Sequence, residues 1–333
     1  MDKTKKKILV TGGAGFIGSH LVDQLLKLQH KVFVVDNLCN GKIENLSNAQ
    51  QSDNFTFYDA DVLDKNEMKR LTINLDYIFH LACLGVRHSL HSPINNHKVN
   101  AEGTLNVLLA AVKNKVKKFF YISTSEIYGK TLEFPINEES PAFPTTIYGA
   151  SKLAGEYYTK SCNERYGLDY TIIRLFNNYG PRAHFEGDSG EIIPRSIIRI
   201  LYDKNPIIFG NGMITRDFLF VKDTAHILCQ LLLMSNISGL TLNVGAGIEF
   251  SMKSIINNIL NKCSNNNLHI EYIDARPADV PRLWVDNTKM KKILGEIKFI
   301  DINEGLHRTI GYYKQLIKDT QFVFNMKDKN WIE

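Results

Sequence analysis

The sequence of 333 residues lacks several features that would place it in a specialised class of protein. No apolar run is long enough to cross a bilayer. The basic start, MDKTKKKILVTGG, has neither the apolar core nor the cleavage site of a signal peptide. The composition is not that of a collagen, a coiled coil or a disordered chain. We therefore expect a soluble, cytoplasmic protein without a membrane partner, whose 44% of apolar residues supply a core for two domains or for one domain with an elaborate second lobe.

Cysteine is scarce and scattered, and the histidines do not form an obvious metal set. The five cysteines are Cys39, Cys83, Cys162, Cys229 and Cys263. Their odd number and the lack of a CxxC spacing argue against a disulfide framework and a zinc site. The histidines of segment 88–97 have no matching carboxylates or thiols, so we predict no metal. We expect Cys83, which follows the motif HLA, to be a packing residue and not a nucleophile.

Positive charge is present only in mild excess. The net charge is +5, and the basic residues do not gather on one face with aromatic residues between them. This pattern argues against a nucleic-acid partner. It is compatible with an anionic small-molecule substrate, but it does not establish one.

The first half of the chain alternates short β-branched runs with amphipathic stretches. Strands are predicted within 7–13, 31–37, 55–62, 75–82, 117–125 and 169–177, and helices within 19–29, 103–114 and after Tyr148. Such alternation indicates βαβ units, so we predict an α/β fold with a Rossmann-type, doubly wound parallel sheet. Ligands of these sheets bind at the carboxyl ends of the strands.

The pattern changes after residue 180. Segment 177–194, NNYGPRAHFEGDSGEIIP, is predicted to be a long loop, followed by a helix at 195–205 and, much later, a helix at about 302–318. Segment 218–247 resembles a return to the first domain. We therefore predict a nucleotide-binding domain from 1–180 with the return segment 218–247. A smaller α/β substrate-binding lobe would comprise 181–217 and 248–333.

A glycine-rich segment, TGGAGFIGSHL, lies between the first strand and the first helix. Gly12, Gly15 and Gly18 would let the backbone turn sharply and approach a pyrophosphate at the helix N-terminus. Asp36 ends the next strand, where a carboxylate can accept both ribose hydroxyls and repel a 2′-phosphate, so the pattern favours NAD over NADP. Asp61 could meet the adenine amino group. For both acids, a turn-capping role is the alternative.

Five motifs together resemble one family over nearly the whole chain. They are TGGAGFIGSHL, HLA at 80–82, NAEGT at 100–104, YGASK at 148–152 and RLFNNYGPR at 174–182. The chain resembles the extended branch of the short-chain dehydrogenase/reductase superfamily, the NAD-dependent nucleotide-sugar epimerases, dehydratases and decarboxylases. The resemblance implies further cofactor contacts from Phe16, Ile17, Asn37, Val62, Leu81, Ala82 and Asn100.

The motif YGASK carries the predicted proton chemistry. Tyr148 and Lys152 are four residues apart and therefore share one face of a helix. A nearby ammonium and a positive nicotinamide ring would lower the pKa of the phenol. Tyr148 could then take a proton from a sugar hydroxyl while NAD oxidises the same carbon, and Lys152 could hold the nicotinamide ribose. The family resemblance implies that Thr124 assists Tyr148.

The segment YISTSEIYG raises the question of which reaction step comes after oxidation. A ketone at C4 of a sugar acidifies the hydrogen on C5, and a carboxylate placed there could remove it. In an extended strand end, Thr124 and Glu126 would point the same way. By resemblance to 4,6-dehydratases, Glu126 is the C5 base and Ser125 assists at the C6 hydroxyl.

Other interpretations of this segment stay open. Uronate decarboxylases also carry Thr-Ser-Glu here, and 4-epimerases usually carry small residues. Glu126 could instead be a structural carboxylate that caps the next turn, and the chain could be a non-catalytic NAD-binding protein.

The substrate lobe is expected to bind the diphosphate of a nucleotide sugar. By resemblance, Arg216 and Arg276 meet the diphosphate, Asp279 meets the nucleotide ribose and Asn177 lies near the sugar. Arg87, within CLGVRHSLHSP, and the unusual loop HFEGDSGEIIP at 184–194 would shape the sugar pocket. The family also implies a homodimer, with the helices 104–114 and 147–164 as its interface.

Overall fold

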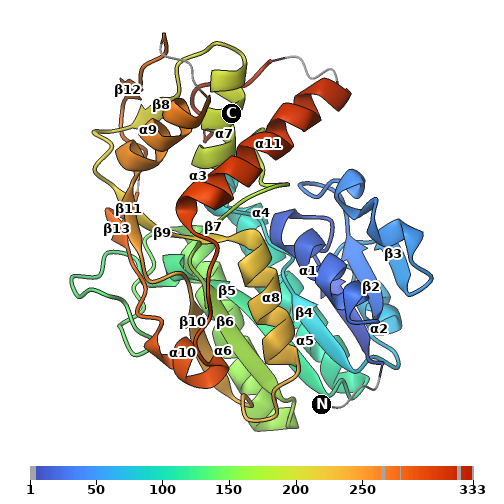
Figure 1. Ribbon diagram of the computed structural model, residues 1–333. Coiled ribbons are helices and arrows are strands. Elements are labelled where there is room, and N and C mark those ends of the chain that lie inside the picture. The colour runs from blue at the N-terminus through green and yellow to red at the C-terminus, as the bar shows by residue number, and fades with distance from the viewer. Residues whose placement is uncertain (1–4, 264–266, 278, 321–323, 332–333) are drawn as a thin grey trace.

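The computed structural model describes residues 5–263, 267–277, 279–320 and 324–331, and it shows two lobes (Figure 1). The larger lobe is built on a seven-stranded sheet in the order β10-β6-β5-β4-β1-β2-β3, in which every pair is parallel. Its strands are β1 (Lys7–Thr11), β2 (Lys31–Asp36), β3 (Phe55–Asp59), β4 (Tyr77–His80), β5 (Lys118–Thr124), β6 (Tyr170–Leu175) and β10 (Leu240–Val244). All seven residues of β5 are buried, as expected for a central strand covered on both faces.

Helices cover both faces of this sheet. On one face lie α1 (Phe16–Lys27) and α8 (Val221–Leu232), and on the other α2 (Lys65–Leu71), α5 (Thr104–Lys113) and α6 (Ile147–Tyr166). The short helices α3 (Val86–His91) and α4 (Pro93–His97) precede a π-helical stretch, Lys98–Gly103, that leads into α5. Within the described residues, none of the helices has the length and apolar content that crossing a membrane requires.

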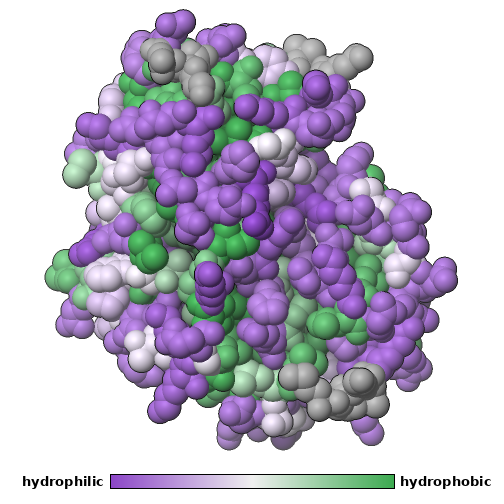
Figure 2. Space-filling view, in the orientation of Figure 1, coloured by the Kyte–Doolittle hydropathy of each residue, from purple (hydrophilic) through white to green (hydrophobic). Residues whose placement is uncertain are grey.

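The smaller lobe has its own core. Its strands are β7 (Asn177–Tyr179), β9 (Thr215–Phe220), β11 (Glu249–Ser251) and β13 (Arg282–Leu283) in one sheet, and β8 (Ile207–Phe209) with β12 (Glu271–Ile273) in another. Its helices are α7 (Ile192–Leu201), α9 (Met252–Cys263) and α11 (Ile302–Thr320), which pack on one another, while α10 (Thr288–Leu294) lies beside β10. In Figure 2, hydrophilic residues dominate the face shown, and hydrophobic ones appear as smaller areas among them.

The predicted α/β fold with a parallel, doubly wound sheet is confirmed. The prediction that 177–194 is entirely loop is wrong at both ends. Asn177–Tyr179 pairs with β9 in parallel, and α7 already begins at Ile192. Asparagine has little preference for strands, so the strand that begins at Asn177 depends on its pairing with β9. β10 joins the first sheet beside β6, whereas the exact division of the chain into two domains stays a prediction.

A buried polar network ties the sheet to α6. Glu156 accepts hydrogen bonds from the Ser123 hydroxyl (2.6 Å) and, through both carboxylate oxygens, from Arg174 (3.0 and 2.8 Å). Arg174 also donates to the Tyr128 hydroxyl (2.8 Å), which in turn donates to Asn243 (2.7 Å). These side chains come from β5, β6, β10, α6 and the turn after β5, so the network fixes the carboxyl end of β5 against the helix.

We expect Glu156→Gln to destabilise the protein strongly, because it leaves the buried Arg174 guanidinium without its countercharge. Loss of one partner of such a pair costs about 3–5 kcal/mol. Urea denaturation should show this decrease in the free energy of unfolding. The matched variant Glu304→Gln removes only an exposed helical pair with Arg308 and should change stability by less than about 0.5 kcal/mol. Equal effects of the two substitutions would contradict the role given to the network.

Candidate active site

A pocket of about 420 Å³ lies at the carboxyl ends of the central strands and extends under the smaller lobe. Its walls include the glycine-rich turn after β1, the ends of β2, β5 and β6, and residues of α6, α7 and β8. This is the position at which parallel α/β sheets bind ligands. Almost every site residue predicted from the sequence lies on its wall.

The glycine-rich turn packs tightly against the end of β4. Gly12 has a φ of +71°, and a Cβ at this position would lie 2.7 Å from the backbone nitrogen of Ala82. A Cβ on Gly18 would lie 2.2 Å from the carbonyl oxygen of Gly12. No side chain caps the start of α1 at Gly15, so its first N–H groups stay available. The turn therefore presents bare backbone to the pocket, which suits a pyrophosphate.

The two predicted acids stand beside this turn, and each also holds a loop. Asp36 accepts hydrogen bonds from the backbone N–H groups of Ala14 and Leu38, both at 2.9 Å. Burial raises the pKa of its carboxyl, and these N–H bonds act in the opposite direction. Asp61 accepts from the Asn37 amide at 2.9 Å. The turn-capping alternative is thus real, but each side chain also lines the pocket where a nucleotide's ribose or adenine would lie.

The remaining predicted cofactor residues line the pocket with one exception. On the wall are Gly15, Phe16, Ile17, Val62, Leu81, Ala82, Tyr148 and Lys152. Asn100 is fully buried away from it, and its amide donates to the Leu84 carbonyl (2.9 Å) and accepts from the Leu84 N–H (2.8 Å). The polar atoms of Asn100 thus fix the segment after β4, and a cofactor contact from Asn100 stays a prediction.

Helix α6 brings Tyr148 to the end of β5. The Thr146 hydroxyl accepts from the N–H of Gly149 (3.1 Å) and starts the helix at Ile147. A Cβ on Gly149 would lie 2.7 Å from the carbonyl oxygen of Glu126, so only glycine allows this approach. The phenol of Tyr148 then lies on the same pocket wall as Thr124, close enough for the Thr124 hydroxyl to lower its pKa. One turn further, the Lys152 ammonium lies 4.4 Å from the centre of the Tyr121 ring.

The pKa of Tyr148 is raised in the protein alone, whereas the expected lowering includes the charge of a nicotinamide ring and stays a prediction. Burial raises the pKa of this phenol well above its ordinary value, and the carboxylates of Glu126 and Glu191 act in the same direction, against the Thr124 hydroxyl. Burial also lowers the pKa of Lys152. In the protein alone, desolvation therefore outweighs the ammonium, and Tyr148 is a neutral phenol.

Glu126 lines the pocket because it lies in a short turn, and not because it continues the extended strand β5 as expected. β5 ends at Thr124, whose hydroxyl accepts from the N–H of Glu126 (3.2 Å) and caps a short 3₁₀ turn, Ser125–Ile127. The alternation of an extended strand therefore does not apply. Burial raises the pKa of the Glu126 carboxyl, while the nearby guanidinium groups of Arg216 and Arg276 lower it. This placement leaves the carboxylate beside the positive end of the substrate lobe.

The predicted substrate residues come together around Asp279. Its carboxylate pairs with Arg216 (3.4 Å) and with Arg276. Asn177 lines the same pocket with a buried side-chain oxygen that has no hydrogen-bond partner in the described part of the chain. Two guanidinium groups that share one carboxylate retain donors for a diphosphate.

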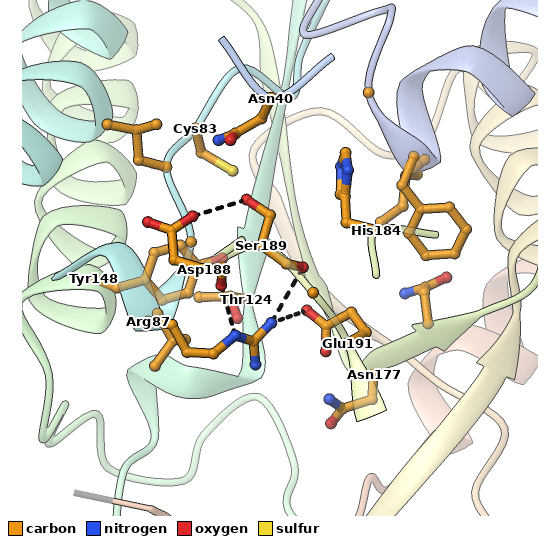
Figure 3. A pocket seen from close by; sticks show the side chains of 18 of the residues that line it. Asn40, Cys83, Arg87, Thr124, Tyr148, Asn177, His184, Asp188, Ser189 and Glu191 are labelled. Carbon is orange, nitrogen blue, oxygen red and sulfur yellow. Dashed lines mark hydrogen bonds and ion pairs between the residues drawn. The ribbon is translucent and has the colours of Figure 1, made fainter. Parts of the chain in front are cut away.

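Elsewhere on the pocket wall, Arg87 contacts the loop within 184–194 that the sequence marks as unusual (Figure 3). Arg87 donates to the carbonyl oxygens of Asp188 (2.6 Å) and Ser189 (3.3 Å) and to the carboxylate of Glu191 (2.8 Å). Sequence reasoning marked this loop as unusual but did not single out Glu191. Cys83 is also exposed on the pocket wall, so its expected role as a packing residue is wrong. Strand β4 ends at His80, the first residue of HLA, so Cys83 lies in the loop that follows the strand.

We expect Gly18→Ala to weaken NAD binding at least about tenfold, because the new methyl group would push on the Gly12 carbonyl and open the turn. Titration of the protein with NAD, followed by intrinsic fluorescence, measures the affinity. Gly311→Ala is the matched control: it is also helical, and a Cβ there meets nothing within 4 Å. That variant should bind NAD normally, and normal binding by Gly18→Ala would contradict the assignment of the turn.

Comparison with known proteins identifies the family. The model of the family described as GDP-mannose 4,6 dehydratase matches residues 9–309. A UDP-glucose 4-epimerase from Mycolicibacterium smegmatis is 34% identical over 311 residues, covering 92% of this chain and 98% of the relative. A UDP-N-acetyl-alpha-D-glucosaminuronate decarboxylase from Bacillus cytotoxicus is 34% identical over 330 residues, covering 95% and 100%.

The solved structures agree with this result and include an NAD-bound neighbour. The dTDP-glucose 4,6-dehydratase DesIV from Streptomyces venezuelae, solved with NAD, has a TM-score of 0.89 and 28% identity, and it covers 94% of this chain and 98% of its own. The glycine turn, the two acids and the buried tyrosine–lysine pair of the present pocket fit the same cofactor. The chain thus belongs to the extended short-chain dehydrogenase/reductase family of NAD-dependent nucleotide-sugar epimerases, dehydratases and decarboxylases.

Proposed function

We propose that this enzyme is an NAD-dependent nucleotide-sugar 4,6-dehydratase. The observation that carries the proposal is the position of Glu126 on the pocket wall, close enough to Tyr148 for its charge to affect the tyrosine. A base beside the residue that handles the C4 hydroxyl is what removal of the C5 hydrogen requires. The acids Asp36 and Asp61 and the glycine turn would hold the NAD. When bound, NAD would accept a hydride from C4 and return it to C6.

Tyr148, Thr124 and Lys152 would manage the proton of the C4 hydroxyl. Tyr148 is a neutral phenol in the protein alone, so its proton is lost only when positive charge is added beside it. The nearby Thr124 hydroxyl lowers the pKa of Tyr148 and so favours the phenolate. Lys152, buried against Tyr121, supplies a nearby positive charge on the same helical face. Together they allow the phenolic oxygen to take the proton as C4 becomes a ketone.

Glu126 would then act at C5 and C6. Its carboxylate takes the C5 proton, the electron pair of that C–H bond forms the C5–C6 double bond, and the C6 hydroxyl leaves. The proton held by Glu126 can pass to this hydroxyl, so that water departs and charge balances. Ser125, only 3% exposed, is a poor acid and can at most orient the leaving group. A carboxyl with a raised pKa suits both steps, because its carboxylate is a stronger base toward the C5 proton and its acid form can still give that proton to the C6 hydroxyl.

Epimerisation or decarboxylation is the second candidate, and the relatives favour it. A 4-epimerase and a uronate decarboxylase each match this chain at 34% identity, and both reactions begin with the same oxidation at C4. They differ from dehydration in the next step, because neither requires a base that removes the C5 hydrogen. The need for Glu126 therefore separates them from the dehydratase.

A homodimer is also proposed, through α5 and α6. These helices pack side by side on the sheet, and Leu109 and Tyr157 are exposed on them. Apolar side chains left in solvent on adjacent helices support a second copy as their cover.

The variant Glu126→Gln tests the proposed reaction. It keeps the shape of the side chain but removes the base, so formation of the product lighter by one water should fall at least about a hundredfold, as for loss of a positioned general base. Mass spectrometry of the products from a panel of nucleotide sugars measures this. Glu139→Gln, an exposed position, is the matched control and should keep wild-type turnover. Full activity of Glu126→Gln would exclude the dehydratase mechanism.

The pH dependence gives an independent test. Glu126 must be deprotonated to act, so kcat should rise with pH as this group loses its proton, and the rise should be centred above the ordinary value of 4.5. The Arg276 guanidinium lowers the pKa of Glu126, so Arg276→Gln should move the acid limb of the kcat profile to higher pH. A limb that stays in place in this variant would mean that another group controls it.

A further inference from the structure

The loop of residues 186–191, here called the acidic loop, is fixed from the side of α3. Arg87 donates to two of its carbonyl oxygens and to the Glu191 carboxylate. His91, one turn further along α3, contacts the Asp188 carboxylate at 2.8 Å. At the start of the loop, the Lys42 ammonium pairs with Glu186 at 2.5 Å. A segment that looks like a flexible insertion in the sequence is therefore built into the pocket wall.

The C-terminal segment, residues 324–331, holds the acidic loop from the opposite side. The Asn330 amide donates to the carbonyl oxygens of Gly187 and Gly190, both at 3.0 Å. This segment is in turn held by α7, because Arg195 donates to the carbonyl of Lys327 and to that of Asp328 (3.2 Å). The acidic loop is thus held from both sides, and the half-exposed Glu191 side chain is itself held by Arg87.

Glu191 lines the same pocket as Tyr148 and Glu126. Its charge raises the pKa of both Tyr148 and Glu126, and it also acts on Arg216, so it lies within electrostatic range of all three. Glu126 and Glu191 therefore present two carboxylates to the space beside the tyrosine. The guanidinium of Arg87, which lies beside Glu191, already makes three hydrogen bonds to the acidic loop.

We infer that Glu191 is a specificity-determining residue that makes the enzyme select a nucleotide sugar with an uncharged hexose and reject the corresponding uronate. The inference rests on the proposed function in one respect, that the sugar lies between Tyr148 and Glu126. Hexose hydroxyls can donate hydrogen bonds to both carboxylates. A uronate adds a third carboxylate close to these two, and like charges so placed repel one another. Arg87, the guanidinium that contacts Glu191, is already paired with it and with the carbonyl oxygens of the acidic loop.

The test compares binding of two ligands that differ only at C6. The NAD-loaded Tyr148→Phe variant, in which turnover is blocked, is titrated by calorimetry with a nucleoside diphosphate glucose and the same nucleoside diphosphate glucuronate. The nucleoside diphosphate used is the one that binds this protein most tightly on its own. We expect at least about tenfold tighter binding of the glucose compound. Adding Glu191→Gln should reduce this preference at least about threefold, mainly by tighter binding of the glucuronate.

Two controls make the outcome specific. Glu186→Gln makes the same chemical change in the acidic loop, at a half-exposed side chain, and should leave the preference unchanged. Unchanged affinity for the nucleoside diphosphate alone shows that Glu191→Gln keeps the site folded. Equal or tighter binding of the glucuronate, or a preference that Glu191→Gln does not alter, would overturn the inference. Failure of the dehydratase proposal is distinguishable, because the product would then keep its mass while the binding preference persists.

Discussion

The contact between the first turn of α6 and the end of β5 determines the geometry of the site. It is closer than a side chain at residue 149 would allow, and the glycine there lets the helix meet the Glu126 carbonyl directly. This single approach brings Thr124, Tyr148 and Glu126 together. The buried pair of Glu156 and Arg174 stabilises it by tying α6 to the sheet. The proposed catalytic groups therefore do not depend on flexible loops for their positions, as a preorganised site requires.

Desolvation dominates the electrostatics of the site. Burial raises the pKa of Tyr148 and Glu126 and lowers that of Lys152, so each group is shifted toward its neutral form. Such a site resists proton transfer until a charged ligand compensates it. In the proposed reaction, a positively charged nicotinamide ring beside Tyr148 would provide this compensation and would link removal of the C4 hydroxyl proton to cofactor binding. The low dielectric that opposes premature ionisation also strengthens the interactions that the substrate makes once it is bound.

Local patterns were sufficient to predict the sheet, the glycine turn and the pair on α6. Buried parallel strands are continuous apolar runs, and residues four apart on a helix share a face, so neither prediction needs tertiary information. The errors have a common cause in contacts between distant segments. The segment Asn177–Tyr179 is a strand only because it pairs with β9, and burial, which no local pattern reports, raises the pKa of Tyr148 in the protein alone. Glu191 could not be singled out because the partner of its loop, Asn330, lies 140 residues from Gly190 in sequence.

The most direct test of the account is the product that the wild-type enzyme forms from a nucleotide hexose in deuterated water, analysed by mass spectrometry and proton NMR. The account predicts a 4-keto-6-deoxy sugar that has lost one water and carries one solvent deuterium at C5. Glu126 has given the original C5 proton to the departing water, so the proton that it delivers to C5 in the return step must come from solvent. A product with the mass of the substrate and its original hydrogen at C5 would contradict it, and Glu126 would then be a structural carboxylate of the turn after β5.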